Sequence, residues 1–230
     1  MTILFETKSL SKYYRTGTAA EVRALDEISI AINAGSVTVV TGPSGSGKTT
    51  LIALLGALER PTRGQVVLEG RDLGVCSDVE LARIRRRIGF IFQDFSLISG
   101  FSVLDNITYP LIPRGISRTE RQERARNLLA RLSIEEKLHV RAGELSGGEQ
   151  QRVAIARALA GEPDAVIADE PTSNLDRDTG QFFLDVVKEL HAGGKTIVLT
   201  SHDPEVFALA TQVIELKGGR LAPPSHGPSA

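Results

Sequence analysis

A glycine-rich segment at residues 42–49 (GPSGSGKT) narrows the folds open to this chain more than any other feature. It follows residues 37–41 (VTVVT), a β-branched run typical of a strand buried on both faces. It precedes residues 48–58, whose apolar pattern predicts a helix. Glycines let such a turn aim backbone N–H groups at phosphate oxygens, and the helix N-terminus attracts the same anion. The order strand, loop, helix therefore predicts a phosphate-binding loop in an α/β fold rather than a flexible glycine–serine turn.

Each position of this loop has an expected role in binding a nucleoside triphosphate. Lys48 is expected to reach the β- and γ-phosphates, and Thr49 to offer its hydroxyl to Mg²⁺. The other residues expected to bind ATP are Gly42, Pro43, Ser44, Gly45, Ser46, Gly47 and Thr50. The loop alone does not distinguish kinases, GTPases, motors and transport ATPases.

Composition excludes several other classes of protein. The 230 residues include 27 basic and 28 acidic side chains, a net charge of −1, so the chain lacks the overall positive charge typical of nucleic-acid-binding domains. A single cysteine, Cys76, excludes an intrachain disulfide and fits a reducing compartment. No apolar run reaches the roughly 18 residues that span a bilayer, and charges interrupt the first residues too early for a secretory signal. If a membrane is involved, we expect this chain to work beside it.

The apolar pattern predicts strands that alternate with helices. Alternation at Ile28, Ile30 and Ile32, together with residues 3–10, predicts an antiparallel N-terminal β region. A mainly helical insertion is expected over about 94–145, with a capping box at Ser117 and Glu120. The remaining expected elements are strands 66–68, 88–92, 165–169 and 196–200, helices 78–87, 147–159, 178–191 and one near 205, and a hairpin of 212–216 with 220–221. Parallel strands joined by crossover helices would form the core sheet.

Two acids end the predicted strand 165–169. Asp169 is expected to bind Mg²⁺, and Glu170 to polarise a water molecule for attack on the γ-phosphate. Acids also mark the point where an ordinary strand leaves the core. However, ligands of α/β sheets bind at the carboxyl ends of the strands. Together with the phosphate loop, this pair favours ATP hydrolysis.

Residues 145–152 (LSGGEQQR) resemble the signature of ATP-binding cassette (ABC) proteins. Ser146 and the amides of Gly147 and Gly148 would cap a helix and present a second anion-binding site. The other family elements follow in order over about residues 2–221. The resemblance implies a P-loop ATPase cassette with a mainly parallel core sheet, an antiparallel N-terminal β region and a helical insertion. One ABC domain is expected over 1–222, with a helical subdomain at about 94–160, and residues 223–230 are expected to be disordered.

The resemblance also implies roles for single residues. Tyr14 matches the aromatic residue that stacks on adenine, with Tyr13 as the competing candidate. Gln93 matches the glutamine that senses magnesium and the attacking water. His202 matches the switch histidine that contacts the γ-phosphate. The implied catalytic residues are Glu170, His202 and Gln93, and the implied magnesium ligands are Thr49, Gln93 and Asp169.

In this family, the signature of one subunit faces the phosphate loop of another. The resemblance therefore implies a head-to-tail homodimer that holds two ATP molecules. ATP binding would close the dimer, and hydrolysis would reopen it. The residues expected to contact the ATP of the partner subunit are Ser146, Gly147, Gly148, Glu149 and Asp176.

Within the family, the chain is most similar to the lipoprotein-releasing and macrolide-export ATPases, although Ser173 stands where that group often has glycine. The implied function is to power a separate membrane permease from the cytoplasmic face of the membrane, in an ABC exporter, a lipoprotein-release system or a mechanotransmission system. The alternative is a cell-division ATPase that regulates cell-wall hydrolysis. The permease is expected to dock in a groove around residues 93–114. The candidate apolar contacts are Phe95, Leu97, Ile98 and Phe101.

A DNA-repair cassette ATPase is the weakest alternative. Such proteins usually insert long coiled coils between loop and signature, whereas Lys48 and Leu145 are 97 residues apart and no heptad pattern fills the interval. The basic run of Arg83 and residues 85–87 is attributed to a solvated helix face, because the overall charge is balanced. No nucleic-acid partner is expected.

Overall fold

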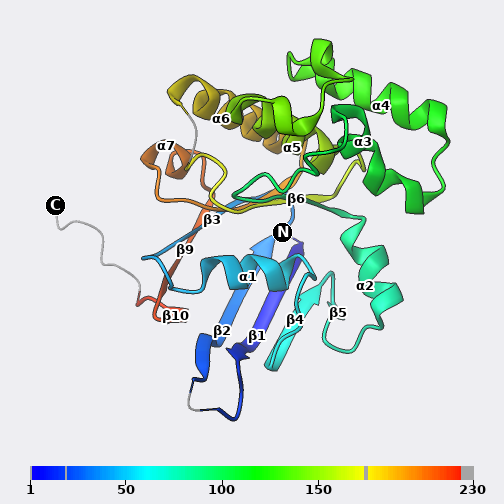
Figure 1. The fold of residues 1–230 in the computed structure, drawn as a ribbon. Coiled ribbons are helices and arrows are strands. Elements are labelled where there is room, and N and C mark those ends of the chain that lie inside the picture. Colours follow the sequence, from blue (N-terminus) through cyan, green and yellow to red (C-terminus); the bar gives the residue numbers. More distant parts are fainter. Residues whose placement is uncertain (1, 19, 174–175, 224–230) are drawn as a thin grey trace.

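The computed structural model describes residues 2–18, 20–173 and 176–223, which form two sheets and a layer of helices (Figure 1). The first sheet has the strand order β2-β1-β4-β5, and all of its pairs are antiparallel. Its strands are β1 (Ile3–Tyr14), β2 (Val22–Asn33), β4 (Arg63–Leu68) and β5 (Arg71–Asp72). The predicted antiparallel N-terminal region is therefore confirmed.

The second sheet has the order β10-β9-β3-β8-β7-β6, and only its β9–β10 hairpin is antiparallel. Every residue of β7 and β8 is buried, which explains why these strands read as continuous apolar runs. Its strands are β3 (Val37–Thr41), β6 (Ile88–Ile91), β7 (Ala165–Ala168), β8 (Thr196–Thr200), β9 (Gln212–Lys217) and β10 (Arg220–Leu221). The predicted mainly parallel core sheet and the closing hairpin are confirmed.

Helices cover both faces of this core sheet. Figure 1 shows α1 between the two sheets, and α3 to α6 on the opposite side of the core sheet. The α-helices are α1 (Lys48–Leu55), α2 (Asp78–Arg85), α3 (Val103–Thr108), α4 (Arg118–Arg131), α5 (Gly147–Leu159), α6 (Arg177–Ala192) and α7 (Pro204–Phe207). Short 3₁₀ helices are η1 (Tyr109–Arg114), η2 (Glu135–Lys137) and η3 (Ala142–Glu144).

The core sheet separates two apolar clusters, because successive strand residues face opposite sides. Val39 and Leu199 pack with α3 to α6, whereas Val40 and Val198 pack with α1 and the N-terminal sheet. The carboxyl ends of β3, β7 and β8 therefore lie side by side between two packed layers. The positions of the residues that follow these strand ends are therefore fixed by the packed core sheet.

Several expected element boundaries differ from those of the structure, most of them by one to three residues, and the largest differences are in β1 and β2. Helix α1 ends at Leu55 rather than 58, because Gly56 caps it and Ala57 adopts a φ of 55°. The strands β1 and β2 are longer than predicted. Their pairing continues past register shifts, where Ser9 and Glu27 have φ values of 43° and 55°.

The predicted capping box at the start of α4 forms only in part. The Ser117 hydroxyl accepts the Glu120 N–H at 3.2 Å. The Glu120 carboxylate instead pairs with Arg124, one helical turn further on. The expected disordered tail, apart from Pro223, lies outside the described residues, as do Asn174 and Leu175. Among the described residues, no helix combines the length and apolar character needed to cross a bilayer.

Candidate functional site

The loop between β3 and α1 is shaped by close backbone approaches. A Cβ atom on Gly42 would lie 2.0 Å from the carbonyl oxygen of Leu216, and one on Gly47 would lie 2.4 Å from that of Ala24. Both glycines also have positive φ values, 136° and 101°. The loop can therefore follow this path only with glycine at these two positions. The exposed residues of the loop are Pro43, Ser44, Gly45 and Thr49, while Thr50 is half-buried.

The Lys48 side chain lies at the centre of the site. Its ammonium donates to the carbonyl oxygen of Gly42 at 2.8 Å and lies 3.0 Å from Nε2 of His202. Oε1 of Glu170 is 3.5 Å away. The structure thus brings together three residues that the sequence predicted for the phosphate site, from α1, the end of β7 and the end of β8.

The contact between Lys48 and His202 fixes the role of one histidine nitrogen. A lysine ammonium has hydrogens to donate and no lone pair. Nε2 of His202 therefore accepts the hydrogen from Lys48. Oε1 of Glu170 lies 3.8 Å from the same Nε2. A cavity of about 230 Å³, lined by polar and charged residues, adjoins Glu170 and His202.

The two strand-end acids occupy different environments. Asp169 is buried, and its Oδ1 accepts the hydroxyl of Thr200 at 2.7 Å. Glu170 is partly exposed and has a φ of 41°, in the left-handed region. The backbone N–H of Glu170 donates to the same Thr200 hydroxyl at 2.7 Å. Thr200 was not among the site residues predicted from the sequence. The available signal was a hydroxyl at the carboxyl end of a buried strand.

The residues expected to bind Mg²⁺ offer a hydroxyl, an amide and a carboxylate. Thr49 and Gln93 are exposed, and Oδ2 of Asp169 makes no hydrogen bond with the described residues. In the described parts of the chain, no group of three or more acidic, histidine or cysteine side chains is arranged to hold a metal. Mg²⁺ at nucleotide sites commonly uses one or two carboxylates, with substrate phosphates and water completing the shell. The donor set therefore fits a magnesium ion that binds together with a nucleotide.

A buried hydroxyl in the loop also fits a phosphate ligand. Ser46 is buried, and its Oγ has no hydrogen-bond partner among the described residues. A buried polar atom without a partner costs free energy. An anion held in the loop is the kind of group that would accept this hydrogen.

The signature residues form the start of α5. Ser146 caps the helix, and its N–H donates to the Glu149 carboxylate at 2.8 Å, which completes a capping box. Lys137 lies 2.9 Å from the other oxygen of Glu149. The lysine contact and the Ser146 N–H lower the pKa of Glu149 to about 2. The predicted helix cap at Ser146 is therefore confirmed, with Gly147 and Gly148 in its first turn.

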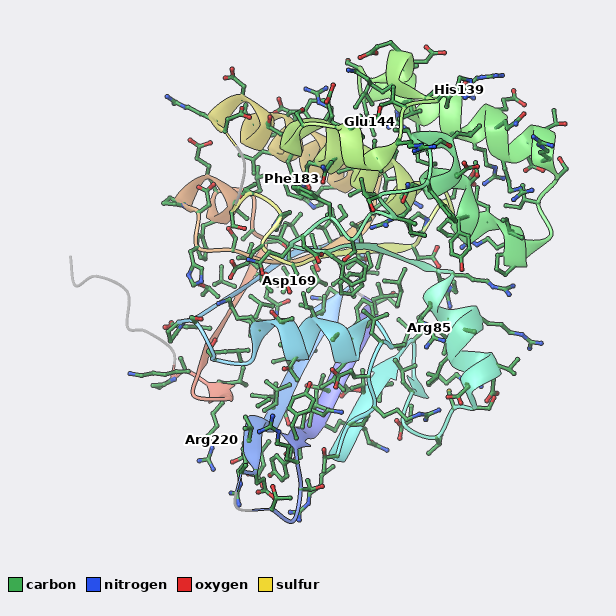
Figure 2. All side chains as sticks on the ribbon, viewed as in Figure 1. Arg85, His139, Glu144, Asp169, Phe183 and Arg220 are labelled. Carbon is green, nitrogen blue, oxygen red and sulfur yellow. The ribbon has the colours of Figure 1, made fainter. Side chains whose placement is uncertain are left out.

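The structure does not bring the signature to the phosphate loop of the same chain. No hydrogen bond or ion pair between described residues joins Ser146, Gly147, Gly148 or Glu149 to residues 42–49. Figure 2 shows Asp169 at the core sheet and Glu144, just before the signature, among the upper helices. Asp176 caps α6 by accepting the Thr179 N–H at 2.9 Å. Of the residues expected to contact a partner's ATP, Ser146, Glu149 and Asp176 thus cap helices within the single chain. Gly147 and Gly148 lie in the first turn of α5.

The two candidate aromatics are held by different partners. Tyr14 donates its hydroxyl to the Glu59 carboxylate at 2.9 Å, and Lys12 lies 5.0 Å from its ring centroid. Burial raises the pKa of Tyr14, while the hydroxyl of Thr50, in the first turn of α1, acts in the opposite direction. Tyr13 donates to Asp26 instead. Proximity to the loop therefore favours Tyr14.

Gln93 follows β6 and opens an exposed turn. Arg157 of α5 donates to the carbonyl oxygens of Phe95 and Ser96, at 2.6 and 2.5 Å. Burial lowers the pKa of this arginine. Arg157 was not predicted as a site residue, because an arginine on a helix gives no signal for a contact with a distant turn.

Comparisons with known proteins agree on one family. The sequence pattern of the ABC transporter family matches residues 25–173. A macrolide export ATP-binding/permease protein MacB from Hyphomonas neptunium is 43% identical over 219 residues, which are 95% of this chain and 34% of that protein. An uncharacterised ABC transporter ATP-binding protein from Thermotoga maritima is 42% identical, over 95% of this chain and 93% of its own length.

A solved structure is similar over the same length. The dimeric ATP-binding cassette MJ0796, in a post-hydrolysis state with ADP and Pi, matches with a TM-score of 0.90 and 38% identity. The match covers 96% of this chain and 97% of that one. This chain thus spans about a third of the MacB relative and nearly all of the separate cassettes.

Proposed function

Because this chain belongs to the ABC transporter family, as an ATPase cassette, we propose that it powers a membrane permease in an export, lipoprotein-release or mechanotransmission system. The meeting of Lys48, Glu170 and His202 carries the proposal for the chemistry. A cation, a carboxylate and an imidazole, on a loop shaped for phosphate, form a site suited to hydrolysis of a terminal phosphate.

In this proposal, the chain's own residues bind the phosphates, orient them and activate the attacking water. Lys48 exchanges its carbonyl and imidazole contacts for oxygens of the β- and γ-phosphates. Glu170 accepts a proton from the attacking water, and His202 contacts the γ-phosphate. Thr49, Gln93 and Asp169 would hold Mg²⁺, which neutralises phosphate charge when bound. Tyr14 stacks on the adenine.

We propose that two copies assemble head to tail around two ATP molecules. The support is that the signature lies apart from the phosphate loop in one chain, while MJ0796 was solved as a dimer. Ser146, Gly147, Gly148, Glu149 and Asp176 would then face the nucleotide of the other copy. A helix start with free N–H groups is suited to an anion.

The proposed permease partner is supported by the MacB relative, whose name joins ATP-binding and permease functions. A cavity of about 360 Å³ between α2, β6 and η1 offers a docking place. None of the four apolar residues expected to contact the permease lines this cavity. Ile98 and Phe101 are exposed, Phe95 is half-buried, and Leu97 packs on the core. With this partner, the chain would lie at the cytoplasmic face of the membrane.

The charge of this cavity indicates the chemistry of the docking segment. It is lined by aromatic and proline side chains with four arginines, and no described carboxylate borders it. The four are Arg85, Arg86, Arg114 and Arg157. The proposed permease segment therefore carries carboxylates beside apolar residues.

Co-purification from detergent-solubilised native membranes tests this function. We expect a multi-span permease to copurify with the wild-type chain and to be lost with Arg86→Glu. Arg83→Glu is the matched control, because Arg83 is exposed on α2, the helix that Arg86 caps, but does not line the cavity. Recovery with chromosomal repair proteins and without a permease would contradict the transport assignment. Recovery with cell-wall hydrolase regulators would identify the division-associated system.

A further inference from the structure

Thr200 is a buried hydroxyl that joins the two strand-end acids. It is fully buried at the end of β8. Its Oγ1 donates to Oδ1 of Asp169 and accepts the N–H of Glu170, both at 2.7 Å. One side chain from one strand thus binds a carboxylate and the next backbone amide of the neighbouring strand.

The second of these bonds replaces a missing strand bond. The ladder between β7 and β8 ends with Ala168 opposite Leu199. Asp169 still donates its N–H to the carbonyl oxygen of Ile91 in β6. The chain then leaves the sheet at Glu170, whose N–H binds the Thr200 hydroxyl rather than a strand carbonyl.

This bond helps to hold Glu170 in an unfavourable backbone conformation, together with the N–H and hydroxyl of Ser173, which donate to the Glu170 carbonyl at 3.2 and 3.0 Å. A φ of 41° is disfavoured for a residue with a Cβ atom, and it persists only where neighbouring groups determine it. With this backbone, Oε1 of Glu170 lies 3.5 Å from Nζ of Lys48. An extended residue at this position would send the side chain in another direction.

The first bond orients the buried carboxylate of Asp169. Its Oδ1 is occupied by the hydroxyl, while Oδ2 has no partner among the described residues. A carboxylate fixed in this way presents one defined oxygen to a ligand. Without this hydrogen bond the carboxylate could rotate, and the position of the oxygen that faces the ligand would no longer be fixed.

We propose that Thr200 is a positioning residue for hydrolysis, which sets the carboxylate of Asp169 and the backbone of Glu170 with a single hydroxyl. The inference rests on the proposed roles of these two acids. Thr200 does not touch the reacting atoms, so its effect passes through them. Since His202 follows two residues later, the same strand end also carries the histidine of the site.

Two buried threonines on β8 allow a comparison that distinguishes positioning of the acids from the general effect of removing a buried hydroxyl. Thr196, also buried, accepts the N–H of Gly35 at 2.9 Å, at the opposite end of the strand. Thr196→Val and Thr200→Val each remove one buried hydroxyl with nearly unchanged volume. Both are expected to lower the melting temperature. Only Thr200→Val is expected to lower kcat, by about 10-fold or more, because two bonds to the acids are lost.

Further measurements report on Asp169 and Glu170 rather than on the stability of the fold. Thr200→Ser keeps the hydroxyl and is expected to retain kcat within about 3-fold of wild type. ATP with EDTA is expected to raise the melting temperatures of Thr200→Val and of the wild type by the same amount. The additional rise produced by Mg²⁺ should shrink, because Asp169 is no longer oriented. If Thr200→Val does not fold, Thr200→Ala replaces it.

Three outcomes would overturn the proposal: an unchanged kcat in Thr200→Val, an equal loss of kcat in Thr196→Val, or no rescue by Thr200→Ser. Glu170→Gln is assayed in parallel. If Glu170→Gln abolishes hydrolysis and Thr200→Val does not, only the role of Thr200 fails. If Glu170→Gln retains hydrolysis, the proposed function of the acid fails instead.

Discussion

The ammonium nitrogen of Lys48 lies 3.5 Å from a carboxylate oxygen of Glu170, although one residue begins α1 and the other follows β7. The parallel register of β3, β8 and β7 brings these strand ends together. Lys48 is almost fully buried, while a quarter of the Glu170 side chain is exposed. The carboxylate is therefore both held by a cation and open to water, as a base that activates water must be.

Glu170→Gln is expected to abolish turnover while ATP still binds. The amide keeps the size of the side chain but cannot take the proton, so steady-state hydrolysis should fall by about 100-fold or more. Phosphate release and equilibrium ATP binding measure the two effects separately. Glu189→Gln, an exposed acid on α6 that pairs with Arg131, is the control. Near-normal turnover in Glu170→Gln would remove it from the catalytic role.

Tyr14→Ala is expected to weaken ATP binding more than Tyr13→Ala. Stacking of a base on an aromatic ring contributes about 1–3 kcal/mol, so the dissociation constant should rise by at least about 5-fold. Tyr13 is hydrogen-bonded to Asp26 rather than near Thr50, and it serves as the matched control. A larger loss in Tyr13→Ala would reverse the assignment.

Ser146→Ala and Ser77→Ala test whether the signature does more than cap a helix. Both serines belong to capping boxes, with Glu149 and Glu80 respectively. Loss of either cap should reduce the free energy of unfolding by about 1 kcal/mol. Only Ser146→Ala should also reduce ATP hydrolysis, because α2 carries no expected nucleotide contact. Equal activity in the two variants would leave Ser146 a structural cap.

The free energy of unfolding is expected to fall as the pH drops from about 5 toward 2, in part through Glu149. Its pKa is lowered from 4.5 to about 2 in the folded chain. The ionised carboxylate therefore stabilises the fold fully above 4.5, and this contribution disappears as the pH falls through the folded value.

Glu149→Gln measures this contribution, expected at about 1 kcal/mol. Glutamine can still accept the Ser146 N–H, but it does not titrate and loses the ion pair with Lys137. Urea unfolding of the two proteins should differ near neutral pH and converge near pH 2. A constant difference across this range would show that Glu149 does not provide the dependence.

Local signals made much of the fold and of the site predictable. The helix 147–159 and the strand 196–200 have the bounds that the sequence predicted. The start of the helix at Ser146 and the strand β8 each depend on residues that are close together in the sequence. The phosphate loop was equally clear, because glycine, lysine and hydroxyl residues follow one another at fixed spacing.

Features that depend on distant residues were not predictable. Bulges at Ser9 and Glu27 interrupt the alternation on which strand prediction relies. The capping box at Ser117 forms only in part, because the Glu120 carboxylate pairs with Arg124. The two bonds of Thr200 depend on the register between β7 and β8, which no local pattern reveals.

The contact of Arg157 with Phe95 and Ser96 has a mechanical consequence. The arginine lies near the end of α5, and the signature lies at its start. A single helix of 13 residues therefore connects the turn after Gln93 with the segment proposed to meet the other copy's nucleotide. In the proposed dimer, a shift of that turn would move α5 and thereby change the position of the signature beside the other copy's nucleotide.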